Sequence, residues 1–190
     1  MKLTNEEEIS EWAFYQCLKN DTIQMRRLIR NSGWAYWYCR DVKDREEMWS
    51  KITESECAYY YCRKVKDRKK VWNKITESEW AYCYCRNVKD RPEIRKKITV
   101  SEYAYYYCKY VKDRPKVRKK ITESRWSYYY CLNIKDRKEV WKNITEPEWL
   151  FKYCYYIKDR PKMFEKIIPD ISWSMQYLKY VKNGLKYKGD

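Results

Sequence analysis

The sequence predicts an all-α protein, an αα-solenoid of about seven to eight helix-turn-helix repeats of 23 residues each. Three observations predict this fold class. A Lys-Asp-Arg tripeptide and a cysteine both recur every 23 residues, the apolar residues between them follow helical spacing, and only three glycines and five prolines occur in 190 residues. The aspartates of the tripeptide are Asp44, Asp67, Asp90, Asp113, Asp136 and Asp159, and the cysteines are Cys39, Cys62, Cys85, Cys108, Cys131 and Cys154.

The first helix of each repeat is expected to resemble the segment from Trp80 to Lys89. Ala81, Cys85 and Val88 lie at i, i+4 and i+7, so they would form its buried face. A threonine followed three residues later by glutamate fits a capping box at the start of this helix, and the serine within the same element is the alternative N-cap. The pattern occurs at Thr53–Glu56, Thr76–Glu79 and Thr99–Glu102.

The second helix is expected to run from Arg91 to Ile98, with Asp90 as its N-cap and with Ile94 and Ile98 buried. Helices of about 8 to 11 residues are not stable alone, so neighbouring repeats must supply the core by stacking. We therefore expect a single repeat-array domain over residues 1–190, with degenerate caps at 1–33 and 168–190.

Two features of the sequence predict where in the cell the protein is located. The first eight residues lack the basic start and apolar run of a signal peptide, and no stretch approaches the roughly 18 apolar residues that a membrane span needs. The sequence therefore predicts a cytoplasmic protein that does not bind membranes. In that compartment the nine cysteines are expected to be reduced.

One segment resembles a known repeat. Leu18-Lys-Asn-Asp21, followed by Ile29-Arg-Asn-Ser-Gly-Trp-Ala-Tyr-Trp-Tyr-Cys39, is similar to a short tandem α-helical repeat of unknown function. That family occurs in protists, amoeba-associated bacteria, giant viruses and phages. The resemblance implies a solenoid and a viral or mobile-element origin. It implies no activity, because the family has none assigned.

A helical wheel of the first helix separates a repeated face from a variable one. Relative to the repeated cysteine, positions −5, −4, −1, 0 and +3 hardly change, whereas positions −2, +1 and +2 vary. Repeated residues of a solenoid pack and variable ones recognise partners, although variable positions can also drift freely. Trp, Tyr and Arg at these positions favour recognition. The candidate binding residues are Trp37, Arg40, Tyr60, Arg63, Lys64, Arg86, Tyr106, Lys109, Tyr110 and Tyr129. Of these, Tyr60, Arg63, Arg86, Tyr106, Lys109 and Tyr129 are expected to be substantially exposed in one continuous stripe.

Charge is concentrated in the middle of the chain. The net charge is +16, of which residues 63–131 carry +13, whereas residues 1–62 carry −2. A central basic belt is therefore expected. Much of it comes from the second helices, at Arg95, Lys96, Lys97, Arg118, Lys119 and Lys120.

Catalytic and metal sites are not expected. The chain has no histidine and no glycine-rich phosphate loop. The repeated cysteines suit core packing better than zinc binding, because neighbouring cysteines point to different helix faces. The aspartate column suits helix N-caps and ion pairs between repeats better than a metal ladder. Stacked packing with wet hydroxyls is expected for Tyr36, Tyr59, Tyr82, Tyr105 and Tyr128.

The sequence therefore predicts a non-enzymatic binding protein without cofactor or metal. Its expected partner is a macromolecule, in the first instance an acidic protein and, given the resemblance, a host factor that a viral or phage protein inhibits. The alternative is RNA or DNA, with Lys and Arg contacting phosphates and aromatic rings stacking on bases. No small-molecule substrate is expected.

Overall fold

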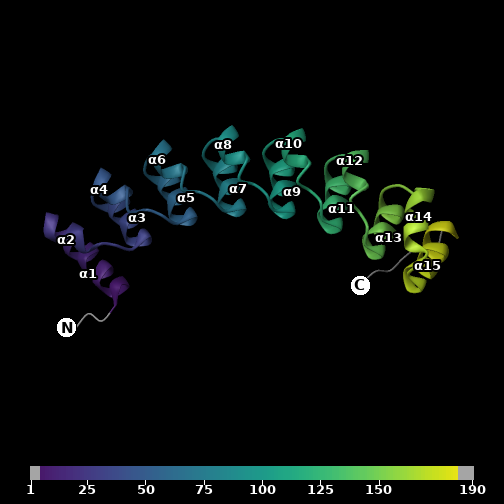
Figure 1. Ribbon diagram of the computed structural model, residues 1–190, viewed down its shortest axis with the longest axis horizontal. Coiled ribbons are helices and arrows are strands. Elements are labelled where there is room, and N and C mark those ends of the chain that lie inside the picture. The colour runs from purple at the N-terminus through teal and green to yellow at the C-terminus, as the bar shows by residue number, and fades with distance from the viewer. Residues whose placement is uncertain (1–4, 184–190) are drawn as a thin grey trace. The chain divides into compact units, whose positions relative to one another are not determined.

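The computed structural model describes residues 5–183, so the outer ends of both predicted caps, residues 1–4 and 184–190, lie outside the described residues. Over this range the chain forms fifteen α-helices and one π-helix, without any strand (Figure 1). Longer and shorter helices alternate, and each packs mainly against its neighbours in the chain. The fold is therefore the all-α helical-repeat solenoid that the 23-residue period predicts.

Each repeat contributes one first helix and one shorter second helix. The first helices are α1 (Glu6–Lys19), α3 (Ser32–Asp41), α5 (Ser55–Lys64), α7 (Ser78–Asn87), α9 (Ser101–Tyr110), α11 (Ser124–Asn133) and α13 (Pro147–Tyr156). The second helices are α2 (Ile23–Leu28), α4 (Glu46–Trp49), α6 (Lys69–Trp72), α8 (Pro92–Arg95), α10 (Pro115–Arg118), α12 (Lys138–Trp141) and α14 (Pro161–Ile167). The last repeat contains α15 (Ile171–Gln176), which continues into the π-helix η1 (Tyr177–Lys182).

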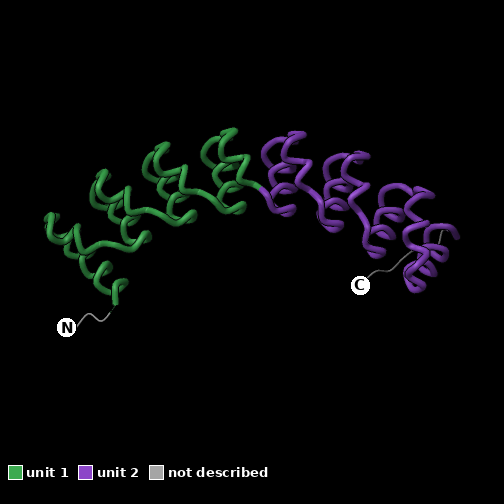
Figure 2. Tube along the Cα trace, viewed as in Figure 1, with its two compact units in different colours: residues 1–98 green, residues 99–190 purple. Residues whose placement is uncertain are grey.

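The chain divides into two compact units, residues 1–98 and residues 99–190 (Figure 2). In the first unit, α3 packs against α1 and α5, and α5 packs against α7. In the second unit, α11 packs against α9 and α13, and α13 also contacts α14, α15 and η1. In both units a second helix packs on the first helix of its own repeat.

The predicted buried faces are largely confirmed. Ala81 and Cys85 of α7 are buried, and so are Ile94 and Ile98 around α8. Val88 is only half-buried, because α7 ends at Asn87 and the valine is the C-cap residue. The tyrosine beside each repeated cysteine is fully buried, which places the most invariant ring of the repeat at the centre of the core.

The predicted capping boxes are wrong. The helices begin at the serine itself, and the N-cap residues Glu54, Glu77 and Val100 make no side-chain capping bond. The serine instead joins two repeats: the Ser55 hydroxyl accepts hydrogen bonds from the backbone N–H of Thr76, at 2.9 Å, and of Glu77, at 3.3 Å. A buried hydroxyl must find such partners, and here they belong to the following repeat.

The prediction that Asp90 caps the second helix is also wrong, because Arg91 is the N-cap of α8. The ion pairs expected between repeats are confirmed. Asp44 accepts a hydrogen bond of 2.7 Å from the Tyr61 hydroxyl and pairs with Arg68 at 2.5 Å, while Arg68 also donates to that hydroxyl at 2.6 Å. We call this arrangement the polar seam. It recurs as Asp21–Tyr38–Arg45, Asp67–Tyr84–Arg91, Asp113–Tyr130–Arg137 and Asp136–Tyr153–Arg160.

Candidate binding surface on the first helices

The polar seam fixes which side of each first helix faces outward. The seam tyrosine and the repeated cysteine are both buried, and a turn of about 100° per residue places positions −2, +1 and +2 on the opposite side. We call these three positions the outer face. It contains every candidate binding residue that the sequence predicts.

In the first unit, the outer face carries both rings and cations. The exposed side chains there include Arg40, Arg63, Lys64 and Arg86, and Trp37 is 38% exposed. Tyr60 is half-buried. The expectation of substantial exposure therefore holds for Arg63 and Arg86 but is wrong for Tyr60, whose ring lies 5.8 Å from that of Trp80 in the next repeat.

The outer face extends into α1, which supplied none of the predicted binding residues. Tyr15 and Leu18 occupy positions −2 and +1 relative to Cys17, and they are 49% and 48% exposed. The signal for them was present in the sequence, because Cys17 lies 22 residues before Cys39. The segment that the sequence predicts as a degenerate cap, residues 1–33, therefore adds two exposed apolar side chains to the outer face.

Several cations of the outer face are held in place by aromatic rings and hydroxyls. The Arg40 guanidinium lies 3.7 Å from the centre of the Trp37 ring and donates two hydrogen bonds to Asp41, at 2.7 and 2.8 Å. Arg63 donates to the Tyr59 hydroxyl at 3.0 Å. Such contacts orient an exposed cation and add stability of roughly 0.5–1 kcal/mol per cation–π pair.

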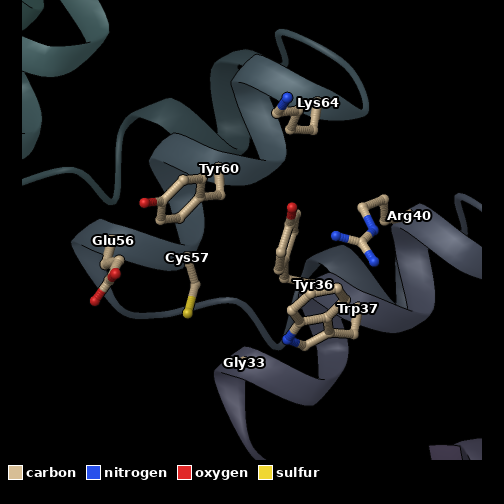
Figure 3. A pocket seen from close by; sticks show the side chains of 8 residues that line it. All are labelled: Gly33, Tyr36, Trp37, Arg40, Glu56, Cys57, Tyr60 and Lys64. Atoms are coloured by element: carbon tan, nitrogen blue, oxygen red, sulfur yellow. The ribbon is translucent and has the colours of Figure 1, made fainter.

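A pocket of about 340 Å³ opens between α3 and α5 (Figure 3). Tyr36, Trp37 and Arg40 line it from α3, and Cys57, Tyr60 and Lys64 line it from α5. Four predicted site residues therefore meet here: Trp37, Arg40, Tyr60 and Lys64.

A second hollow, of about 370 Å³, lies next to the first, between α1 and α3. Trp37 lines both, so it forms a wall that the two hollows share. The remaining lining residues of the second hollow are Phe14, Tyr15, Leu18, Trp34 and Asp41.

In the second unit, the outer face forms a packed aromatic cluster. The rings of Tyr106 and Tyr110 stack at 6.2 Å, and Lys109 lies 5.2 Å from the Tyr110 ring. Tyr110 is half exposed and Lys109 is exposed, but Tyr106 and Tyr129 are only partly so. The expected exposure of those two tyrosines is therefore wrong. The reason is Trp126, whose ring lies 5.5 Å from Tyr106 and 5.9 Å from Tyr129.

The basic belt of the second helices is smaller than its charge count suggests. Arg95 pairs with Asp90 at 2.7 Å, and the Lys97 ammonium donates to the Asn73 carbonyl of the preceding repeat at 2.7 Å. Arg118 is buried and pairs with Asp113 and Glu139. The side chains of Arg95, Lys97 and Arg118 therefore take part in the fold. Of the predicted group, Lys96 and Lys119 are exposed.

The repeated cysteines are buried, as predicted, and all nine cysteines carry free thiols. Burial raises the pKa of Cys39, Cys62, Cys108 and Cys131 to about 12, so these thiols stay protonated and unreactive at neutral pH. Over residues 5–183, His, Cys, Asp and Glu side chains form no cluster that could hold a metal ion.

The five repeated tyrosines that were expected to stack with water-exposed hydroxyls are buried: Tyr36, Tyr59, Tyr82, Tyr105 and Tyr128. The Tyr59 hydroxyl accepts hydrogen bonds from Arg63 and from Asn87 of the next repeat, each at 3.0 Å. These buried rings therefore pack beneath the residues of the outer face. Among the described helices, none has the length and apolar character needed to cross a lipid bilayer.

The outer face thus presents rings, apolar side chains and oriented cations. Comparison of the chain with protein-family models, with curated proteins and with solved structures found no match.

Proposed function

We propose that this chain is a non-enzymatic binding protein that engages a protein partner through the outer face of its first helices. The observation that carries the proposal is the group of exposed Tyr15, Leu18 and Trp37 around two adjoining hollows in the first unit. Contiguous exposed apolar side chains rimmed by polar ones are typical of interaction sites. Trp, Tyr and Arg supply most of the energy at protein interfaces.

The cations beside this group indicate the character of the partner. Arg63, Lys64 and Arg86 are exposed on the same face of α5 and α7, so an acidic protein surface would complement them. We propose a cytoplasmic setting for the interaction. The resemblance to repeats of viruses and phages makes a host protein the proposed class of partner.

Nucleic acid is the second candidate, and the observation that favours it is the net charge of +13 over residues 63–131. The contacts that those cations make within the fold weaken the case for a nucleic-acid partner. Arg68 and Arg91 form the polar seam, and Arg95, Lys97 and Arg118 are also engaged within the fold. Fewer cations are then available for phosphates than the count implies.

The test compares two matched charge reversals and one aromatic truncation. Arg63→Glu with Arg86→Glu changes the outer face, whereas Lys66→Glu with Lys89→Glu makes the same charge change at exposed positions after the helices. With a partner captured by the wild-type chain, Trp37→Ala should weaken binding by about 30-fold, which corresponds to about 2 kcal/mol. The first pair should weaken it less, and the control pair least.

A nucleic-acid partner gives a different result. The protein purified at low salt would then show a raised ratio of absorbance at 260 to 280 nm. Removing outer-face cations would also flatten the dependence of log affinity on log salt, by roughly 0.7–0.9 for each phosphate that is no longer neutralised. If neither the outer-face charge pair nor Trp37→Ala changes the affinity for a captured partner, the proposal is refuted.

A further inference from the structure

The pocket between α3 and α5 coincides with a break in the repeat. Five residues before the repeated cysteine, one first helix, α5, carries a small side chain, Cys57. At the same position, the first helices α1, α3, α7, α9, α11 and α13 carry an aromatic residue: Trp12, Trp34, Trp80, Tyr103, Trp126 and Trp149.

Neighbouring repeats show what that aromatic residue does. Trp80 stacks on Tyr59 of the preceding repeat at 5.5 Å and approaches Tyr60 at 5.8 Å. Trp34 packs in the same way on Phe14 and Tyr15, at 5.3 and 6.1 Å. In the second unit, Trp126 repeats this packing on the two tyrosines before it. The indole therefore fills the space over positions −3 and −2 of the preceding repeat.

At α5 that space lies over Tyr36 and Trp37, and no tryptophan fills it. Both rings line the pocket, together with Cys57 on the opposite side. Gly33 also lines the pocket, with backbone atoms alone. Its backbone N–H donates to the Asn31 side chain at 2.8 Å, and a Cβ there would lie only 3.0 Å from the same oxygen, so the helix start favours glycine.

We infer that this pocket receives one indole or phenol side chain of the partner protein, in place of the tryptophan that the adjoining repeats supply from within the chain. The inference rests on the proposed function and names the group by which the partner enters the outer face. The occupant's chemistry follows from the repeat itself, since the equivalent space between α5 and α7 holds the ring of Trp80. A carboxylate beside that side chain would meet the exposed Lys64 at the rim.

Size agrees with a protein side chain. An apolar cavity of roughly 150 Å³ already binds benzene, so about 340 Å³ accommodates an indole. Arg40 and Lys64 line the pocket together with Glu56, so its charge suits an aromatic side chain that has a carboxylate beside it.

The test fills the pocket with the residue that the repeat uses elsewhere. Cys57→Trp should fold at least as stably as the wild type, because the new ring gains the stack that Trp80 makes. Lys89→Trp is the matched control, since it adds the same side chain at an exposed position after α7, outside the outer face. The probe is N-acetyl-5-fluorotryptophanamide, and its binding is followed by ¹⁹F line broadening.

Wild type and Lys89→Trp should bind the probe equally, and Cys57→Trp should bind it at least about tenfold more weakly. Trp37→Ala removes a wall of the pocket and should also weaken binding, which keeps the test decisive if Cys57→Trp does not fold. Equal probe binding by Cys57→Trp and wild type, or no binding by the wild type at millimolar probe, overturns the inference.

The captured partner separates this inference from the proposed function. If Cys57→Trp retains full partner affinity while Trp37→Ala and the outer-face charge pair weaken it, the pocket inference fails and the proposed function stands. If none of these variants changes partner affinity, both fail. Reduced affinity in Cys57→Trp, with Lys89→Trp unchanged, supports both.

Discussion

Replacing Tyr84 by phenylalanine removes one hydroxyl from the polar seam and leaves the ring in place. Tyr84 is fully buried, donates to Asp67 at 2.6 Å and accepts from Arg91 at 2.7 Å. Hydrogen bonds to charged groups contribute about 1.5–3 kcal/mol each, and the ion pair between Asp67 and Arg91 would remain. Both bonds are lost, but Asp67 and Arg91 are partly exposed and keep each other as partners, so we expect Tyr84→Phe to lower the free energy of unfolding by about 1.5–3 kcal/mol, less than the sum for two such bonds.

The assay is a urea titration followed by far-ultraviolet circular dichroism, together with thermal melting. At about 2–4 °C per kcal/mol for a chain of this size, the midpoint temperature should fall by about 3–12 °C. Tyr60→Phe is the matched control, because Tyr60 is half-buried on the outer face of the same unit. It should change stability by about 0.5 kcal/mol or less. Equal midpoints for the two variants would refute the view that the seam holds adjacent repeats together.

Two further predictions follow from buried neutral groups. Burial, followed by hydrogen bonding to aspartate, raises the pKa of Tyr38 and Tyr130 to about 12, and burial raises that of Cys62 to about 12. The unfolded chain releases these protons near pH 9 to 10, so stability should fall as the pH rises from about 9 to 12; a urea midpoint that is constant from pH 8 to 11 would contradict this. Cys108→Ala should cost about 1 kcal/mol in the same assay, whereas Cys108→Arg should prevent folding of the array, because it buries an unpaired charge.

The fold could be predicted from the sequence because the same pattern of residues recurs in every repeat. The alternation of helices, the buried alanines and isoleucines, and the ion pairs between repeats all follow from the period. The helix starts were less predictable. Ser55 bonds to residues 21 and 22 positions later, so its partners recur with the same 23-residue period as the residues of its own helix. Spacing alone cannot separate a cap from a bond to the next repeat.

The candidate site was predicted in part. The wheel identified the outer face, including Trp37, Arg40, Tyr60 and Lys64 around the pocket. The pocket itself was not predicted, although Cys57 stands in a column of aromatic residues. The small side chain of Cys57 opens a pocket only because the aromatic residues at this position pack over the preceding repeat rather than within their own repeat. That packing depends on how neighbouring repeats stack, and one repeat considered alone does not contain it.

The boundary between α3 and α5 tolerates the absence of a tryptophan at Cys57 because it is held on its opposite side. Between α3 and α5, the Ser32 hydroxyl still accepts hydrogen bonds from the backbone N–H of Thr53 and Glu54, at 3.1 and 3.3 Å. Tyr61, Asp44 and Arg68 still form the polar seam there. If the proposed function is correct, recognition lies on the side of the helix opposite the polar seam, so the outer face can vary at little cost to the fold. Seam variants should accordingly change stability while the folded fraction keeps its partner affinity, and outer-face variants should do the reverse.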